Sequence, residues 1–303
     1  MQPGDTIGIC APAGPVPEDE LFRGVDLLHK RGYRTKVAAA TVTEVQPLRY
    51  LANDDRSRLQ GLHELLVDDD VGMVLCARGG YGTQRLYPYL PPLMRDYPNK
   101  VLCGYSDITG LHTAFRGRLT RIHGPNLSTL LAMDDLSSCW FWNLVEQHVA
   151  AVELPETETT LDVLVPGTAS GVLEGGNLCI LAHCCGTQFQ PQFSNCIVLL
   201  EDVGEPLYRV DRYLTQLINS GALYNAVGFI LGTVSPAAGA TETVDSGELR
   251  QLWLDRLAPL QVPVVSGARF GHVANPYALP MGVHATLDAD CRKITIQTPM
   301  NTG

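Results

Sequence analysis

Short apolar runs alternate with amphipathic segments through the first 116 residues of the chain. Strands are predicted at Thr6–Pro12, Arg34–Ala39, Val71–Ala77 and Val101–Gly104. Helices are predicted at Glu18–Lys30, Asp54–Val67 and Asp107–Arg116. In the second helix, the apolar spacing predicts that Leu59, Leu62, Leu65 and Leu66 face inward. A helix between two neighbouring strands allows them to run parallel, and parallel strands are covered by helices on both faces. The alternation therefore predicts an α/β domain built on a parallel sheet.

The second half of the chain follows a different pattern. Residues 137–165 include the polar stretch ELPETETTLD, which is typical of a segment that crosses between domains. Beyond it, buried apolar runs are mixed with a glycine-rich stretch and an alternating pattern about Asp288–Cys291 that predicts a hairpin. A chain of 303 residues accommodates two domains of roughly 150 residues. We expect an N-terminal α/β domain over residues 1–150 and a mixed α+β C-terminal domain over residues 166–303.

The charge pattern argues against several classes of partner. The formal net charge is −10 and Lys and Arg form no run, so no electrostatic footprint for nucleic acid or anionic lipid is present. The start of the chain has no basic segment before an apolar core, and nowhere do about 18 apolar residues follow one another. We therefore predict a cytoplasmic protein with no nucleic-acid or membrane partner.

The sequence also lacks the usual motifs for nucleotides and metals. The loop CAPAGP has one glycine among prolines, and ARGGYGTQRL has no Lys-Ser/Thr after its glycines, so neither is a phosphate-binding loop. Most of the nine cysteines lie in apolar, strand-like runs, where free thiols behave as small hydrophobes; these are Cys10, Cys76, Cys103, Cys179 and Cys196. The pair Cys184–Cys185 follows His183 but has no second ligand cluster at zinc-site spacing. We predict no cofactor and no metal.

Ser106 follows the fourth predicted strand, within the sequence Gly104-Tyr105-Ser106-Asp107. Reactive groups of open parallel sheets gather at the carboxyl ends of the strands, and a second loop at this edge is Arg78-Gly79-Gly80-Tyr81-Gly82. A serine in a tight strand-to-helix turn resembles a nucleophile elbow, although position 108 is isoleucine where the full G-x-S-x-G motif has glycine. Serine and aspartate are also the favoured helix N-caps, so both interpretations stay open.

A nucleophilic serine needs a base and a group that orients the base. His272 lies in a loop directly after a buried run and a glycine, where no packing rule accounts for an imidazole. The run CIVLLEDVGE delivers Glu201 and Asp202 at a predicted strand end, where a carboxylate could orient a histidine or cap the following helix. The order Ser, Glu, His matches one known triad arrangement.

Six fragments of the sequence together resemble the LD-carboxypeptidase family of serine peptidases. They are RGGYG at 78–82, GYSDIT at 104–109, HGPNL at 123–127, GGNL at 175–178, LLEDVGEPLYRVDRYL at 199–214 and FGHVANPYALPMGVHA at 270–285. The fragments occur in the order of the family over nearly the whole chain. The resemblance implies an N-terminal α/β domain that carries the serine and a C-terminal domain that carries the glutamate and the histidine.

By motif position, the resemblance makes Ser106 the nucleophile, His272 the general base and Glu201 its orienter, with Glu205 as the alternative to Glu201. Members of the family remove the terminal D-alanine from muropeptide tetrapeptides in the cytoplasm, during cell-wall recycling, by cutting after the L centre of a diamino acid. The resemblance therefore implies a muropeptide as substrate and a homodimer as the assembly.

The remaining roles follow from the chemistry that this reaction requires. We expect the backbone N–H groups of Gly80 and Asp107 to bind the oxyanion, since the first has no side chain and the second starts a helix. We expect Arg78 to bind the terminal carboxylate of the substrate through a bidentate fork, although an ion pair with a neighbouring helix is an equal alternative. Tyr81 and Asn177 are further candidates for lining the substrate pocket.

Two rival functions remain open from the sequence. A related branch uses the same triad on acyl-sulfamoyl adenylates or peptidyl-nucleotide antibiotics, but this chain has no added aromatic segment between Glu174 and Glu201 to stack on adenine. The other rival is a noncatalytic ligand-binding α/β protein, in which Ser106 would be a helix cap and Glu201 a surface charge.

Overall fold

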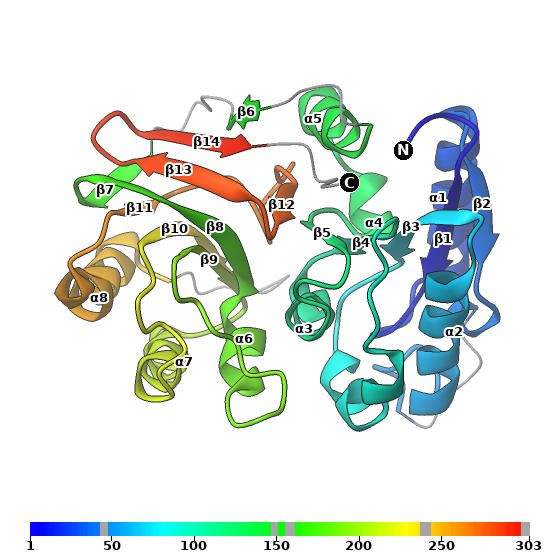
Figure 1. Cartoon of the computed structure of the whole chain (residues 1–303), viewed down its shortest axis with the longest axis horizontal. Coiled ribbons are helices and arrows are strands. Elements are labelled where there is room, and N and C mark those ends of the chain that lie inside the picture. The colour runs from blue at the N-terminus through cyan, green and yellow to red at the C-terminus, as the bar shows by residue number, and fades with distance from the viewer. Residues whose placement is uncertain (43–47, 147–150, 155–160, 237–243, 298–303) are drawn as a thin grey trace. The chain divides into compact units, whose positions relative to one another are not determined.

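The computed structural model describes residues 1–42, 48–146, 151–154, 161–236 and 244–297 of the chain. These residues form two compact units, each with its own sheet (Figure 1). The first unit contains the described residues up to 146 together with Tyr277–Pro280. The second contains the described residues from 151 to 276 and from 281 to 297. Both units mix helices with strands, as predicted.

The first unit is built on a mostly parallel sheet, which confirms the expectation from the sequence. In its described residues the strand order is β12-β5-β4-β3-β1-β2. The registers show β1, β2, β3, β4 and β5 running parallel. The bounds are β1 Thr6–Cys10, β2 Arg34–Val37, β3 Val71–Cys76, β4 Val101–Gly104, β5 Thr120–His123 and β12 Leu279–Met281. The strand β12 comes from late in the chain and lies beside β5.

The helices of the first unit follow the apolar periodicity of the sequence with one informative exception. Their bounds are α1 Glu18–Lys30, α2 Asp55–Val67, α3 Thr109–Ala114, α4 Leu127–Leu130 and α5 Asp135–Val145. Asp54 caps α2 by accepting the N–H of Ser57 at 2.9 Å. In α2 the leucines Leu62 and Leu65 are buried as predicted, but Arg58 is buried where Leu59 was expected to face inward.

A short 3-10 turn precedes α3, where a single helix over 107–116 was predicted. This turn, η4, comprises Ser106–Ile108, and the longer 3-10 segment η2 comprises Thr83–Tyr89. The other 3-10 segments are η1 Ala39–Thr41, η3 Pro91–Leu93 and η5 Ala258–Leu260. The chain therefore tightens at the carboxyl end of β4, where Ser106 lies.

The second unit is built on a mixed sheet, with the strand order β6-β14-β13-β8-β9-β10-β11-β7 in its described residues. The strands β8, β9, β10 and β11 run parallel, and β13, β14, β6 and β7 pair antiparallel with their neighbours. The strand bounds are β6 Ala151–Glu153, β7 Asp162–Val165, β8 Thr168–Asn177, β9 Cys196–Val203, β10 Gly228–Ser235, β11 Val264–Ser266, β13 His284–Asp288 and β14 Lys293–Gln297. The predicted hairpin is β13 and β14.

In the described part of the second unit, three helices cover the sheet: α6 Leu178–Cys184, α7 Leu207–Asn219 and α8 Ser246–Leu257. The helix α7 buries Val210, Leu214 and Leu217, which recur at helical spacing, and these side chains share a core with β9. The segment expected to cross between the domains, residues 137–165, carries most of α5 and the strands β6 and β7. Residues 147–150 and 155–160 of that segment lie outside the described part of the chain.

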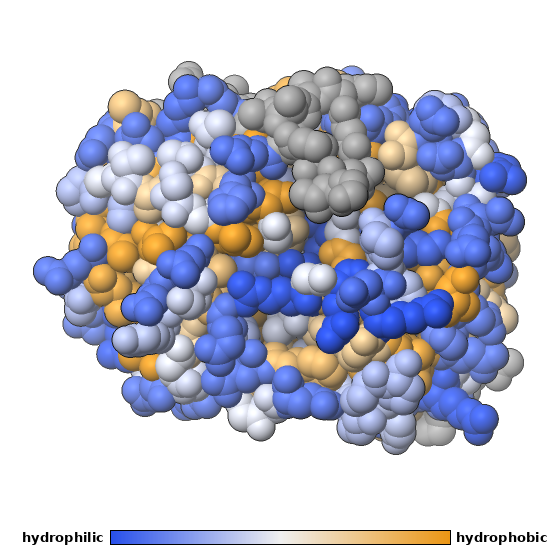
Figure 2. All heavy atoms as spheres, viewed as in Figure 1, coloured by the Kyte–Doolittle hydropathy of each residue, from blue (hydrophilic) through white to orange (hydrophobic). Residues whose placement is uncertain are grey.

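The helices of both units were compared in length and apolarity with a membrane-spanning helix. Among the residues that the structure describes, no helix is both long and apolar enough to cross a membrane. On the face seen in Figure 2, hydrophobic residues lie in patches among hydrophilic ones.

Candidate active site

Glu201 and His272 form a close pair within the second unit. Glu201 lies near the carboxyl end of β9 and is 1% exposed, so its carboxylate is buried beneath the surface. His272 follows β11 in a loop, and its Nδ1 atom lies 2.7 Å from Oε2 of Glu201. The main-chain N–H of His272 donates to the same oxygen at 3.2 Å. The carboxylate therefore restrains both the ring and the backbone of the histidine.

The surroundings of His272 favour its protonated form. Burial lowers the pKa of the imidazole, but the hydrogen bond to Glu201 and the charges of Glu201 and Asp202 outweigh burial, so the pKa lies above its ordinary value. Gly271 has φ +76°, and a Cβ atom there would collide with the carboxylate of Glu201. A glycine at this position thus allows the loop to approach Glu201 closely.

The other two acidic residues of the LEDVGE segment have different partners. Glu205 lies just before α7 and accepts hydrogen bonds from two residues of that helix, from Arg209 at 3.3 Å and from the hydroxyl of Tyr213 at 3.2 Å. Asp202 is 2% exposed and accepts from the side chain of Asn177 and from the N–H of Cys179, each at 2.9 Å. Of the two glutamates that the sequence left open, Glu201 is the one bonded to His272.

Ser106 occupies a strained turn in the first unit. It lies two residues beyond β4 and has φ +65°, in the left-handed region that residues other than glycine seldom adopt. Neither η4 nor α3 has a side-chain hydrogen bond at its N-cap, so the capping interpretation of Ser106 finds no support. Backbone strain of about 1–3 kcal/mol at one residue is characteristic of functional turns, where surrounding contacts hold it in place.

The loop of residues 78–83 lies against Ser106. A Cβ atom at Gly79 would lie 2.8 Å from Cβ and 3.1 Å from Oγ of Ser106, so only glycine fits there without displacing the serine. Gly80 has φ +104°, and a Cβ atom there would lie 3.2 Å from Cα of Gly14. The two predicted oxyanion donors, Gly80 and Asp107, thus belong to two segments that both contact or adjoin Ser106 within the first unit.

The predicted substrate-binding residues have the following positions. Arg78 is exposed and donates from Nη1 to the carbonyl of Pro15 at 3.0 Å. Tyr81 is 48% exposed and packs edge-on against Tyr50. Asn177 is 4% exposed; it caps α6 by accepting the N–H of Ile180 at 3.1 Å and donates to Asp202. The polar atoms of Asn177 are therefore engaged within the second unit.

The burial of two charged side chains, those of Asp107 and Arg58, was not predicted from the sequence. Asp107 is 2% exposed and Arg58 is 1% exposed. A signal for Arg58 was present, because it lies four and seven residues before Leu62 and Leu65 and so shares the apolar face of α2. Nothing in the local sequence separates a buried aspartate at position 107 from an ordinary helix cap.

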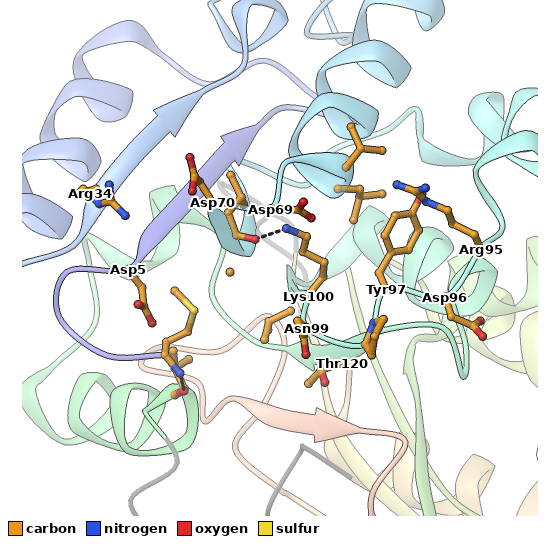
Figure 3. Close-up of a pocket in the computed structure, with 18 residues that line it drawn as sticks. Asp5, Arg34, Asp69, Asp70, Arg95, Asp96, Tyr97, Asn99, Lys100 and Thr120 are labelled. Carbon is orange, nitrogen blue, oxygen red and sulfur yellow. Dashed lines mark hydrogen bonds between the residues drawn. The ribbon is translucent and has the colours of Figure 1, made fainter. Parts of the chain in front are cut away.

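A pocket of about 620 Å³ opens at the opposite edge of the first sheet (Figure 3). It is lined by residues at the amino ends of β3, β4 and β5, such as Asp70, Lys100 and Thr120. Lys100 is buried, and its ammonium group donates to the carbonyls of Asp68 and Val71. Ser106 follows the carboxyl end of β4, so the pocket lies at the other end of these strands.

The described residues contain no group of three His, Cys, Asp or Glu side chains arranged to hold a metal ion. All nine cysteines are free thiols, and Cys10, Cys76, Cys103 and Cys196 are buried in strands as expected. Cys179 is half-buried in α6, where a strand-like run was expected.

Comparison with known proteins assigns the family. The model of the LD-carboxypeptidase N-terminal domain matches residues 7–124, and that of the LD-carboxypeptidase C-terminal domain matches residues 170–287. The chain belongs to the LD-carboxypeptidase family, and it is therefore an enzyme of the serine hydrolase class. The resemblance carried by the six fragments is confirmed.

Curated relatives align over nearly their whole length. A putative carboxypeptidase from Streptomyces coelicolor is 38% identical, covering 99% of this chain and 95% of the relative. A probable murein peptide carboxypeptidase from Bacillus subtilis is 34% identical, covering 100% and 95%. The murein tetrapeptide carboxypeptidase of Pseudomonas aeruginosa is 32% identical, covering 94% and 93%.

Solved structures share the fold. The muramoyltetrapeptide carboxypeptidase of Oxalobacter formigenes has a TM-score of 0.77 at 29% identity, covering 96% of this chain and 97% of that one. The microcin C7 self-immunity protein MccF, solved with aspartyl sulfamoyl adenosine, has a TM-score of 0.84 at 21% identity, covering 100% and 98%. At that identity the likeness to MccF is one of fold.

Proposed function

We propose that this enzyme removes the terminal D-alanine from muropeptide tetrapeptides by cutting the bond that follows the L centre of a diamino acid. In this proposal Ser106 is the nucleophile, His272 the general base and Glu201 its orienter. The observation that carries the proposal is the 2.7 Å contact between Nδ1 of His272 and the buried carboxylate of Glu201. In serine hydrolases the general base is an imidazole that a carboxylate holds in this way, and the contact supports the proposed roles of both residues.

The chemistry follows from the tautomer that the pair selects. The Nδ1–H group donates to Glu201, so Nε2 is the proton acceptor of His272. As Ser106 Oγ attacks the scissile carbonyl, Nε2 takes its proton and then delivers that proton to the amino group of the departing D-alanine. Water, activated by the same nitrogen, attacks the acyl-enzyme and regenerates Ser106. The negative charge of Glu201 stabilises the imidazolium that forms in both steps.

The strained turn of Ser106 supports its role as nucleophile. With φ +65° after β4, the serine lies in a tight turn that resembles a nucleophile elbow, in which such a turn exposes Oγ. The backbone N–H groups of Gly80 and Asp107 are the proposed oxyanion donors. Loss of one such donor costs about 3–4 kcal/mol of transition-state stabilisation.

A carboxypeptidase must also recognise the free carboxylate of its substrate. We propose Arg78 for this role, since its guanidinium is exposed and offers further donors beyond the one bonded to Pro15. Tyr81, half exposed beside Gly80, is the proposed wall of the pocket. Asn177 is proposed to act indirectly. It donates to the carboxylate of Asp202, the residue after Glu201, and so helps to fix the end of β9 that carries Glu201.

The test is incubation with L-Ala-γ-D-Glu-diaminopimelate-D-Ala and detection of free D-alanine by mass spectrometry. We expect release by the wild-type enzyme and its loss in Ser106→Ala, Glu201→Ala and His272→Ala. Release retained in folded Ser106→Ala would contradict the mechanism. Cleavage of an aspartyl sulfamoyl adenosine with no action on the tetrapeptide would identify the rival substrate class, and binding of the peptide without turnover would identify a noncatalytic protein.

We also propose that the enzyme is a homodimer and that it acts in the cytoplasm, as the family resemblance implies. The tetrapeptide would reach it after returning to the cell interior. Light scattering of the purified protein measures the mass of the particle, which for a dimer is expected to be twice the chain mass of 32.9 kDa. Fractionation of cells tests the location.

A further inference from the structure

The side chain of Asp107 bonds to the loop of residues 78–83 beside the serine. Its Oδ2 atom accepts the main-chain N–H of Thr83 at 2.8 Å, and the N–H of Gly82 also faces the carboxylate. In return, the hydroxyl of Thr83 donates to the main-chain oxygen of Asp107 at 2.7 Å. Thr83 is 0% exposed and Asp107 is 2% exposed, so water does not compete for these bonds.

The contact continues along η2 and α3. The hydroxyl of Tyr87 donates to the carbonyl of Gly110 at 2.9 Å. A Cβ atom at Gly110 would lie 2.6 Å from the hydroxyl oxygen of Thr83, so the start of η2 packs tightly on the start of α3. The end of the loop is thereby attached to the helix that follows Ser106.

Arg58 holds the residue before Thr83. Its Nη1 atom donates to the carbonyl of Gly82 at 3.0 Å and also to the carbonyl of Pro12, while Nε donates to the carbonyl of Asn53 at 3.1 Å. One guanidinium thus joins three loops at the carboxyl edge of the first sheet. Its positive charge also favours the ionised form of Asp107.

Helix capping does not account for burying this carboxylate. The starts of η4 and α3 have no side-chain capping bond, so Asp107 is not their cap. Burial raises the pKa of Asp107 to about 6, although the hydrogen bonds from Thr83 lower it. The net rise means that this buried position disfavours the negative charge of the carboxylate. The bonds that the carboxylate and main chain of Asp107 make go to the end of the loop of residues 78–83, through the N–H and the hydroxyl group of Thr83.

We infer that the side chains of Asp107 and Thr83 are positioning residues, which hold the loop of residues 78–83 at a set distance from Ser106 and so place the N–H of Gly80 for the oxyanion. This inference rests on the proposed function, because it assumes that Ser106 is the nucleophile and Gly80 a donor. Gly79, packed on Ser106, and Thr83, bonded to Asp107, are the two anchor points on either side of Gly80.

Three variants test the positioning role. Thr83→Val keeps the shape of the side chain but removes the hydroxyl bond, Thr83→Ser keeps that bond, and Asp107→Asn turns one accepting oxygen into a donor that faces an N–H group. We expect kcat for D-alanine release to fall roughly 10- to 100-fold in Thr83→Val and Asp107→Asn, with KM changed less than about threefold. Thr83→Ser is expected to retain most of the wild-type kcat.

The matched control is Thr113→Val on α3. Thr113 donates its hydroxyl to the carbonyl of Thr109 at 2.9 Å and does not belong to the contact with the loop, so its loss is expected to leave kcat unchanged. Equal kcat values in wild type, Thr83→Val and Asp107→Asn, or a rise in KM alone, would overturn the inference. So would an equal loss of kcat in Thr113→Val.

Hydrogen exchange separates this inference from the proposed function. Amide exchange in residues 79–83 of the folded protein is expected to be faster in Thr83→Val and in Asp107→Asn than in Thr113→Val, whatever the substrate is. If Thr83→Val and Asp107→Asn keep wild-type amide exchange and wild-type kcat, the positioning role is refuted. The proposed function still stands in that case, provided that Ser106→Ala is inactive. Full activity in Ser106→Ala refutes the proposed function, and with it the placement of Gly80 for an oxyanion. Amide exchange would then still show whether Thr83 and Asp107 hold the loop of residues 79–83.

Discussion

Oε2 of Glu201 accepts two hydrogen bonds from His272, one from the main-chain N–H at 3.2 Å and one from the imidazole Nδ1 at 2.7 Å. One buried oxygen therefore sets the backbone, the ring orientation and the tautomer of the proposed base. The strand β9 supplies the carboxylate and the loop after β11 supplies the histidine, so the parallel core of the second unit carries the geometry.

Glu201→Gln is expected to lower kcat by about 10³- to 10⁴-fold, because the amide cannot stabilise the imidazolium and can favour the wrong tautomer. Steady-state kinetics of D-alanine release measures the change. Glu205→Gln is the matched control, since Glu205 pairs with Arg209 and Tyr213, and it is expected to stay within about threefold of wild type. Similar losses in both variants would argue against Glu201 as the orienter.

The pH dependence of kcat/KM should report the raised pKa of His272. The base acts in its neutral form, so the acid limb is expected above the ordinary histidine value of about 6.5. Asp202→Asn removes one of the charges that raise this pKa, and its acid limb is expected at lower pH than that of the wild-type enzyme. An acid limb that does not move in Asp202→Asn would contradict this electrostatic account.

The same pair should contribute to stability with a defined sign. A pKa raised on folding means that the folded state binds the proton more tightly than the unfolded chain. The contribution of His272 is then fully present below about pH 6.5 and is lost as the pH rises through the raised value. Thermal unfolding of the wild type and of His272→Ala across this range measures the difference, which should shrink toward alkaline pH.

Gly271→Ala should damage the site far more than Gly267→Ala. Both glycines have positive φ in the same loop, +76° and +86°, so both substitutions carry a backbone penalty of about 1–2 kcal/mol. A Cβ atom at 271 would also collide with Glu201, whereas at 267 it meets open space. We expect kcat to fall at least roughly 100-fold in Gly271→Ala only. Equal activities would show that the close approach has no role.

Ser106→Gly should be inactive and yet more stable than Ser106→Ala. The residue has φ +65°, which glycine adopts without the steric cost that alanine shares with serine. The gain is partly offset by the greater freedom of glycine in the unfolded chain, so the net difference is expected to be about 0.5–1 kcal/mol. Denaturant titration of the two variants measures it, and a less stable glycine variant would mean that the turn is not strained.

Much of the fold could be read from local patterns. The alternation of apolar runs and amphipathic helices predicted β1, β3, β4, α1 and α2 to within a residue or two, since burial on both faces makes a parallel strand apolar throughout. The strand β12 could not be predicted in this way, because a short late segment joins a sheet formed more than 150 residues earlier. Such pairing depends on long-range contacts that leave no periodic signal.

The sequence by itself determined the chemistry available: a serine after one strand, a glutamate at the end of another and a histidine in a glycine-containing loop. Only the tertiary structure decided that Glu201 rather than Glu205 bonds to His272. Glu201 lies in the buried end of β9, whereas Glu205, four residues later, lies just before α7 and pairs with Arg209 on that helix. It also decided that Asp107 and Arg58 are buried, since burial of a charge depends on donors and acceptors brought from distant segments.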